Sequence, residues 1–125
     1  MLVVDDDSRF RDAVSALLER DERIDVVGFA ANGEEAVRRV LLLRPDLVTM
    51  DVEMPVMDGV EATRRIAEVL PHVRVLMVSA SVYADRAETA RAAGASGYIT
   101  KSRVADELIE TVVAIAGGGD FVVAL

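Results

Sequence analysis

The sequence predicts an α/β domain in which a parallel β-sheet is covered by helices on both faces. Short apolar runs alternate with segments whose apolar residues recur at helical spacing, five times along the 125-residue chain. Such alternation is typical of a parallel sheet with right-handed crossovers. The run Leu47 to Met50 is followed at once by Asp51 and then by a loop that contains Pro55 and Gly59. Apolar or β-prone residues bounded in this way by turn formers indicate a strand buried on both faces.

The other four strands are expected from similar short runs. They are Leu2 to Val4, Ile24 to Ala30, Val73 to Val78 and Gly97 to Thr100. The second run includes Asp25 and Gly28, as an edge strand can. Because the first, third and fourth runs are more apolar than the second and fifth, we expect the spatial order 2-1-3-4-5, which is that of the flavodoxin-like, doubly wound (βα)5 sheet.

The helices between these strands have recognisable ends. Ser8 is the expected N-cap of the first helix. Capping boxes are predicted at the start of the second and third helices, from Asn32 with Glu35 and from Asp58 with Glu61. The fourth helix, from about Tyr83 to Ala93, is rich in alanine, so we expect it to bury little per turn and to dock marginally.

Composition narrows the possible functions. The length fits one domain, and no apolar run approaches the ~20 residues needed to cross a bilayer. The absence of cysteine excludes disulfides and thiolate chemistry, and a single histidine leaves no soft-metal site, so any metal would be a hard cation on oxygen ligands. The net charge of −8 argues against nucleic-acid binding by this fragment. With no signal peptide before the first strand, we expect a cytoplasmic location and no membrane partner.

Charged and polar residues follow four of the five predicted strands. Asp5 and Asp6 follow the first strand, Asp51 the third, Ser79 the fourth and Lys101 the fifth. The carboxyl ends of parallel strands share one rim, where ligands bind. Two ionised carboxylates ~4 Å apart repel by about 4 kcal/mol at an effective dielectric of 20, so the cluster needs a positive partner. Lys101, the only lysine among 14 basic residues, offers one charge, and Mg²⁺ offers two.

Each of these residues also has a plainer interpretation. Asp51 could simply end a strand, Asp7 could start a helix and Ser79 could belong to a turn. Lys101 could be a lone surface lysine, and Tyr98 could be a half-buried aromatic on an edge strand. The joint spacing at successive strand ends favours a shared site, with Asp7 as a helix start only.

Four motifs, in order along almost the whole chain, resemble the receiver domain of two-component response regulators. They are Asp5-Asp6, Asp51-x-x-Met54-Pro55-x-Met57-Asp58-Gly59, Ser79-Ala80, and Ala93-Gly94-Ala95-x-Gly97-Tyr98-x-x-Lys101. The ending Gly-Tyr-x-x-Lys-Ser resembles the NarL/LuxR branch, whose receivers precede a helix-turn-helix DNA-binding domain. The resemblance implies a receiver domain over residues 1–117. It also implies that residues 118–125 begin a linker towards a DNA-binding domain outside this chain.

The resemblance further implies that Asp51 accepts a phosphoryl group from a histidine of a sensor kinase. It places Mg²⁺ on Asp6, Asp51 and the backbone carbonyl of Glu53, with Asp5 acting through water. Such a domain is a phosphoacceptor switch with self-catalysed phosphotransfer and autodephosphorylation rather than an enzyme. DNA is then expected as a partner of the full-length protein, and phosphorylation-dependent homodimers are expected among its assemblies.

The same resemblance assigns three further roles. Ser79 would hydrogen-bond a phosphoryl oxygen, Lys101 would pair with the phosphate, and Tyr98 would turn inward when Ser79 moves. One departure from the family concerns Ser102, which stands where a proline commonly follows the lysine. Because a cis peptide without proline costs about 3 kcal/mol, we expect the Lys101–Ser102 bond to be trans.

Three alternatives stay open. A pseudo-receiver would only mediate protein contacts, although its usual mark, a missing acidic or lysine residue, is absent here. A haloacid-dehalogenase-like phosphohydrolase also uses a strand-end aspartate with a second acid two residues on, as in Asp51-Val-Glu53, but needs a cap and a longer core. A flavodoxin-like flavin carrier would want a hydroxyl- and glycine-rich loop where this chain has three aspartates.

Overall fold

A computed structural model describes all 125 residues, as six strands, five α-helices and one 3-10 helix. The strands are β1 (Leu2–Val4), β2 (Gly28–Ala30), β3 (Leu47–Asp51), β4 (Arg74–Ser79), β5 (Gly97–Thr100) and β6 (Val122–Ala124). The helices are α1 (Ser8–Leu18), α2 (Gly33–Leu43), α3 (Gly59–Val69), α4 (Ala84–Ala92), the 3-10 helix η1 (Lys101–Arg103) and α5 (Val104–Ala116). None of these helices is long and apolar enough to cross a membrane.

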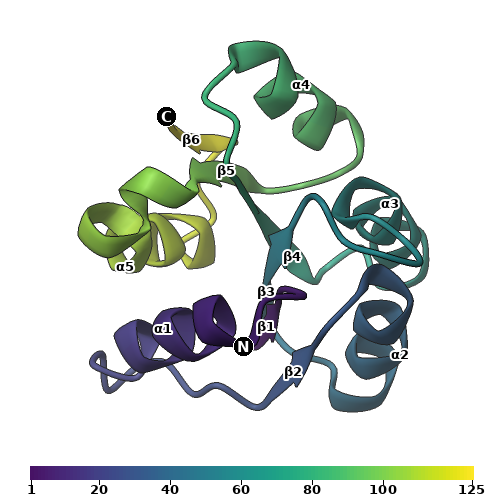
Figure 1. Ribbon diagram of the computed structural model, residues 1–125, viewed down its shortest axis with the longest axis horizontal. Helices are drawn as coiled ribbons and strands as arrows, with labels where there is room; N and C mark the ends of the chain where they lie inside the picture. The colour runs from purple at the N-terminus through teal and green to yellow at the C-terminus, as the bar shows by residue number, and fades with distance from the viewer.

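The strands form one parallel sheet in the order β2-β1-β3-β4-β5-β6. Helices α1 and α5 cover one face of the sheet, and α2, α3 and α4 cover the other (Figure 1). Each face has its own apolar cluster, and side chains of β1, β3, β4 and β5 alternate between the two. Met50 and Met77 belong to one cluster, and Leu76 and Val78 belong to the other. The predicted doubly wound sheet and the relative order of its first five strands are confirmed.

A sixth strand lies in the segment that we expected to begin a linker. Within residues 118–125, β6 pairs with β5, and the Val122 N–H donates to the Ser96 carbonyl at 3.2 Å. Gly97 permits this approach, because a Cβ there would lie 2.9 Å from the Val122 carbonyl oxygen. The sheet therefore extends past the predicted edge.

The predicted helix starts are correct for α2 and α3 and wrong by one residue for α1. The side chains of Asn32 and Asp58 accept hydrogen bonds from the backbone N–H of the residue three positions on, at 2.8 and 2.9 Å. In α1 the cap is Asp7 rather than Ser8, with Asp7 Oδ1 accepting from the Arg9 N–H at 2.9 Å. Aspartate and serine cap equally well, so residue type alone could not choose between neighbours.

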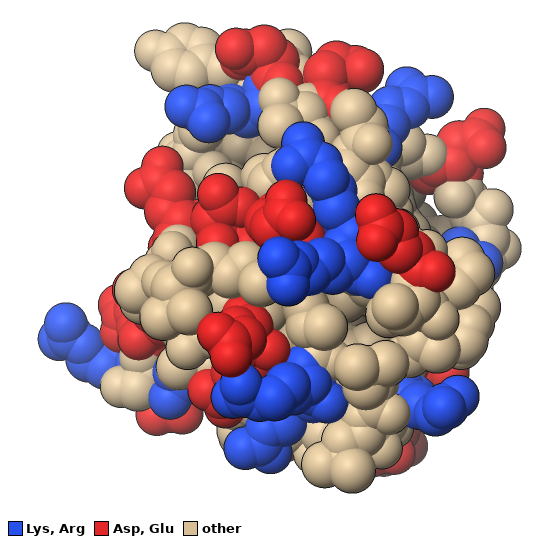
Figure 2. All heavy atoms as spheres, turned by 90° about the vertical axis from the view of Figure 1, so that its right-hand side faces the viewer, with Lys and Arg blue, Asp and Glu red and all other residues tan.

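The outer surface of α2 and α3 carries both signs of charge in alternation (Figure 2). Arg38 pairs with Glu34 at 2.9 Å, and Arg65 pairs with Glu61 at 3.4 Å, each one helical turn apart. Exposed pairs of this kind contribute about 0.2–1 kcal/mol each. The arginine pairs of these helices are therefore solvated faces and not a patch for phosphates.

Candidate functional site

The predicted site residues meet at the carboxyl ends of the strands. Asp5 follows β1 directly, Asp51 and Ser79 are the last residues of β3 and β4, and Lys101 follows β5 as the first residue of η1. The register aligns these ends, since Asp51 lies opposite Val78 and Ser79 opposite Thr100. They line a cavity of about 260 Å³ together with Asp6, Asp7, Glu53 and Ala80.

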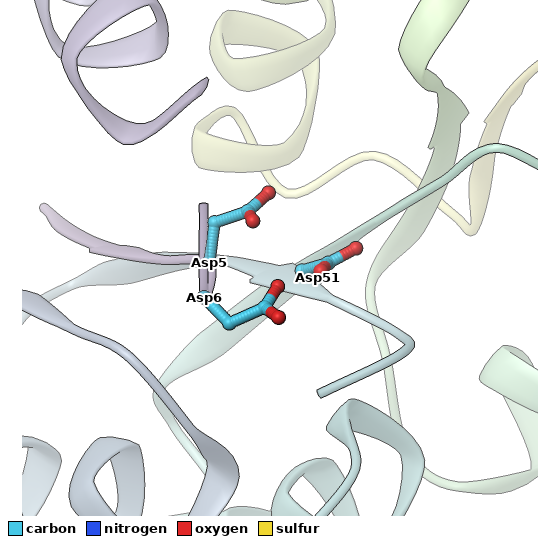
Figure 3. Close-up of side chains that lie close together, drawn as sticks. All are labelled: Asp5, Asp6 and Asp51. Atoms are coloured by element: carbon cyan, nitrogen blue, oxygen red, sulfur yellow. The ribbon is translucent and has the colours of Figure 1, made fainter. Parts of the chain in front are cut away.

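Three carboxylates converge in this cavity. One oxygen from each of Asp5, Asp6 and Asp51 lies within 4.8 Å of the others, and Figure 3 shows the side chains directed into a common space. Asp5 and Asp51 are 2% and 4% exposed, whereas Asp6 is exposed. The Oδ1 atom of Asp5 accepts from the Asp7 N–H, but its buried Oδ2 has no hydrogen-bond partner. These residues form an acidic group that could hold a metal ion.

Lys101 supplies the positive charge that the sequence predicted here. Its Nζ lies 3.3 Å from Asp5 Oδ2 and 3.4 Å from Asp51 Oδ1. Burial alone would lower the pKa of Lys101, but the charges of Asp51 and Asp5 outweigh it and the pKa is raised, so the side chain stays an ammonium. The peptide bond after Lys101 is trans, as expected, because the chain contains no cis peptide.

Asp51 is the carboxylate most perturbed by this environment. Burial, and next to it the charge of Asp5, raise the pKa of Asp51 to about 6, although Lys101 acts in the opposite direction. One positive charge therefore does not fully offset the desolvation and the neighbouring acid. A buried strand-end acid with a strongly shifted pKa in a cleft is typical of a functional site.

Ser79 lines this cavity, and Tyr98 lies beside Ser79 on the side of α4. Ser79 is buried, and its Oγ accepts from the Ser81 N–H at 3.1 Å. Tyr98 is 1% exposed and donates its hydroxyl to the Ser81 carbonyl at 2.7 Å. The plainer interpretation of Tyr98 as half-buried is wrong. The tyrosine points inward in this structure, which describes a single state of the protein. The expected movement of Tyr98 on phosphorylation therefore stays a prediction.

The loop after β3 is anchored to the core and, at its end, to the last residue of β3. Met54 and Met57 pack against the core on the α2–α4 face. Between them, Val56 has φ of 71°, which is strained for a β-branched residue. Gly59 closes the loop, and a Cβ there would lie 2.0 Å from the Asp51 carbonyl oxygen. Nothing in the sequence pattern signals the strain at Val56.

Sequence reasoning missed one neighbour of the site, Phe10. From the sequence alone, Phe10 is only one apolar residue of the first helix. In the structure Lys101 Nζ lies 4.6 Å from the centre of the Phe10 ring. The two residues are far apart in sequence, and the only local signal is that Phe10 stands one helical turn beyond Asp6.

Comparisons with known proteins identify the family. Residues 1–113 match the response regulator receiver domain. The transcriptional regulatory protein LnrK of Bacillus subtilis (strain 168) is 40% identical over 121 residues, which cover 95% of this chain and 54% of LnrK. A protein-glutamate methylesterase/protein-glutamine glutaminase of Alkalilimnicola ehrlichii is 44% identical over an alignment of 128 positions, which covers 94% of this chain and 33% of that protein.

A solved structure gives the same result. The crystal structure of a LuxR-family two-component response regulator from Aurantimonas sp. SI85-9A1 matches with a TM-score of 0.92 and 37% identity, over 96% of this chain and 86% of that chain. This chain spans only about half of LnrK and a third of the methylesterase. The chain belongs to the response regulator receiver domain family, and its homologues include regulators of the NarL/LuxR type.

Proposed function

We propose that Asp51 accepts a phosphoryl group from a phosphohistidine of a sensor kinase. The observation that carries the proposal is the position of its carboxylate, which is buried at the end of β3, within 4.8 Å of two other acids and 3.4 Å from Lys101. A carboxylate oxygen of Asp51 would form the new P–O bond while the P–N bond to histidine breaks, leaving a neutral imidazole after it takes up a proton. Phosphoryl transfer needs little from the protein beyond positioning and charge stabilisation.

The acidic group fits Mg²⁺, the hard cation expected from the sequence. Carboxylate oxygens are the ligands that Mg²⁺ prefers, and the buried Oδ2 of Asp5 accepts no hydrogen bond and has only the ammonium of Lys101, 3.3 Å away, as an ionic partner. Asp6, Asp51 and the Glu53 carbonyl would hold the ion, with Asp5 acting through water. When bound, the ion supplies positive charge against the phosphoryl oxygens.

The remaining rim residues act directly on the phosphoryl group in this proposal. The ammonium of Lys101 pairs with one equatorial oxygen, and the Ser79 hydroxyl donates a hydrogen bond to another once it leaves the Ser81 N–H. Ala80, with only a methyl group, leaves the cavity open beside them. Tyr98 then moves when Ser79 moves, and its movement changes the surface formed by α4, β5 and α5. The chain acts as a switch and not as an enzyme with its own substrate.

The output of this switch lies in the rest of the protein. Because LnrK is a transcriptional regulator and the Aurantimonas protein is of the LuxR family, we propose a DNA-binding domain after the linker that begins within 118–125, so that phosphorylation controls transcription. A second candidate follows from the 44% identity to a methylesterase, in which the same receiver would control an enzyme domain. A cytoplasmic location and a phosphorylation-dependent homodimer stay predictions.

The decisive experiment is incubation with acetyl phosphate and Mg²⁺, followed by intact mass. We expect the wild type to gain one phosphoryl group, which Asp51→Asn does not. Asp58→Asn is the matched control, because Asp58 only caps α3 and lies outside the acidic group. An unmodified wild type would indicate a pseudo-receiver, and turnover of a generic phosphate ester would indicate a haloacid-dehalogenase-like phosphohydrolase.

A further inference from the structure

The ammonium of Lys101 has three neighbours, and one of them is not a carboxylate. Asp5 and Asp51 lie 3.3 and 3.4 Å from Nζ, and the Phe10 ring centre lies 4.6 Å from it. An ammonium within about 6 Å of the centre of an aromatic ring is attracted by the ring quadrupole, and the attraction is stronger when the ammonium is desolvated. The side chain of Lys101 is 31% exposed, so the ring acts on a partly desolvated charge.

Phe10 is itself held in place. Its ring packs against the apolar cluster on the α1–α5 face of the sheet. Phe10 also lines a groove of about 450 Å³ between α1 and α5, whereas the acidic residues line the separate cavity at the rim. Lys101 is the residue common to the linings of both. Lys101 therefore lies between the groove that Phe10 lines and the cavity that the acids line, with its charge directed to both the ring and the carboxylates.

We propose that Phe10 is a positioning residue for phosphoryl transfer, which holds the Lys101 ammonium at the rim between Asp5 and Asp51. This inference rests on the proposed function of Asp51. The lysine stem has four carbons and many rotamers, and the carboxylates alone fix the charge but not the stem. The ring supplies a third fixed point that is neutral, so it persists when cations or phosphoryl oxygens change the charge of the site.

The substitution Phe10→Leu keeps apolar bulk but removes the aromatic face, and Phe10→Tyr keeps the face. Leu17→Ala is the control for the groove, because Leu17 lines the same groove two turns further along α1. Phosphorylation is measured with acetyl phosphate and Mg²⁺, since a small donor needs no docking surface on the protein. A role of Phe10 in contacting a partner would leave this rate unchanged.

We expect Phe10→Leu to slow phosphorylation roughly three- to tenfold, while Phe10→Tyr and Leu17→Ala stay within about twofold of the wild type. Denaturation midpoints of all variants show whether the domain stays folded. Equal rates for Phe10→Leu and wild type would overturn the proposal, and so would equal losses in Phe10→Leu and Leu17→Ala.

The single lysine provides a second measurement. Because Lys101 is the only lysine, its side-chain Hε resonance is unique in a carbon–proton correlation spectrum. Ring current should shift this resonance upfield in wild type and Phe10→Tyr, and the shift should vanish in Phe10→Leu. A wild-type resonance at its random-coil position would overturn the proposal whether or not Asp51 is phosphorylated. A shifted resonance in a wild type that gains no phosphoryl group would mean instead that the proposed function fails, and with it the role of Phe10 in transfer.

Discussion

Helices α3 and α4 cover the same face of the sheet but are attached to it very differently. Helix α3 begins with a side-chain cap from Asp58 and buries the full side chain of Ile66 in the core. Helix α4 has no side-chain cap at Tyr83, and its only buried side chains are the methyl groups of Ala87 and Ala90. A buried isoleucine contributes about 1.5–3 kcal/mol and a buried methyl about 0.8 kcal/mol. The marginal docking predicted for α4 is consistent with this structure.

This difference decides which helix can respond to the site. The start of α3 is fixed to the rim, because Gly59 leaves no room between its backbone and the Asp51 carbonyl. Helix α4 follows the segment from Ser79 to Ser81 and covers Tyr98, whose hydroxyl bonds to that segment. We infer that α3 acts as the fixed support of the phosphorylation site and α4 as the element that can move.

The strongest test of the comparison removes buried volume from each helix. Ile66→Ala should lower the free energy of unfolding by about 2–5 kcal/mol, because it leaves a cavity in the core. Ala90→Gly in α4 should lower it by only about 1–2 kcal/mol, from helix propensity and one lost methyl. Urea denaturation measures both, and equal losses would contradict the distinction between the helices.

A second test removes the negative charge of Asp51 from the rim of the sheet. Since the pKa of folded Asp51 is raised to about 6 from 3.8, the folded state binds more protons than the unfolded state between these values. The contribution of Asp51 to stability is therefore greatest below about pH 4 and is lost as the pH rises through about 6. At 1.36 kcal/mol per pKa unit the loss is at most about 3 kcal/mol.

Asp51→Asn should remove this pH dependence and make the protein more stable at neutral pH by a similar amount. Urea denaturation in EDTA at several values between about pH 4 and pH 8 gives the difference between variant and wild type. This gain in stability should slow the hydrogen exchange of the α3 amides, because these amides exchange only when the whole domain opens. The α4 amides exchange by local opening and should keep their rates. A wild type that gains stability with pH relative to Asp51→Asn would refute the assigned environment of Asp51.

The parts of this structure that sequence predicted correctly depend on local patterns. The apolar run before Asp51, the N-caps Asn32 and Asp58 and the alanines of α4 each act over a few residues, although neither predicted capping box is closed by its glutamate. Strand β6 depends instead on pairing with Ser96 and on the missing side chain of Gly97, more than twenty residues away. The rim residues could be predicted because parallel strands bring their carboxyl ends together, whatever the conformation of the loops between them.

Two features of the site were beyond sequence patterns because residue type does not specify orientation. Whether Tyr98 faces inward depends on the acceptor at Ser81 and on the cover provided by α4. The contact of Phe10 with Lys101 depends on how α1 and η1 pack, and these belong to opposite ends of the chain. Both contacts are long-range, and both decide how the predicted residues work.

Hydrogen exchange gives a third and smaller test. We expect the amides of α4 to exchange by local opening, with a free energy about 2 kcal/mol or more below that of the α3 amides. The backbone hydrogen bonds within each helix are similar, so the difference should come from the burial of side chains. Native-state exchange followed by NMR measures it residue by residue. Equal protection of the two helices would mean that α4 opens only with the whole domain.

The last test changes only the caps. Asp58→Ala should destabilise the domain by about 1 kcal/mol, because the Glu61 N–H loses its acceptor. Tyr83→Asp should stabilise α4 by adding a side-chain cap, since position 83 has the extended backbone of an N-cap and an exposed side chain. The gain, about 0.5–1 kcal/mol, should appear as slower exchange of the α4 amides. If Tyr83→Asp protects α4 and also weakens the response of residues 83 to 101 to beryllium fluoride, then loose attachment of α4 is what lets it move.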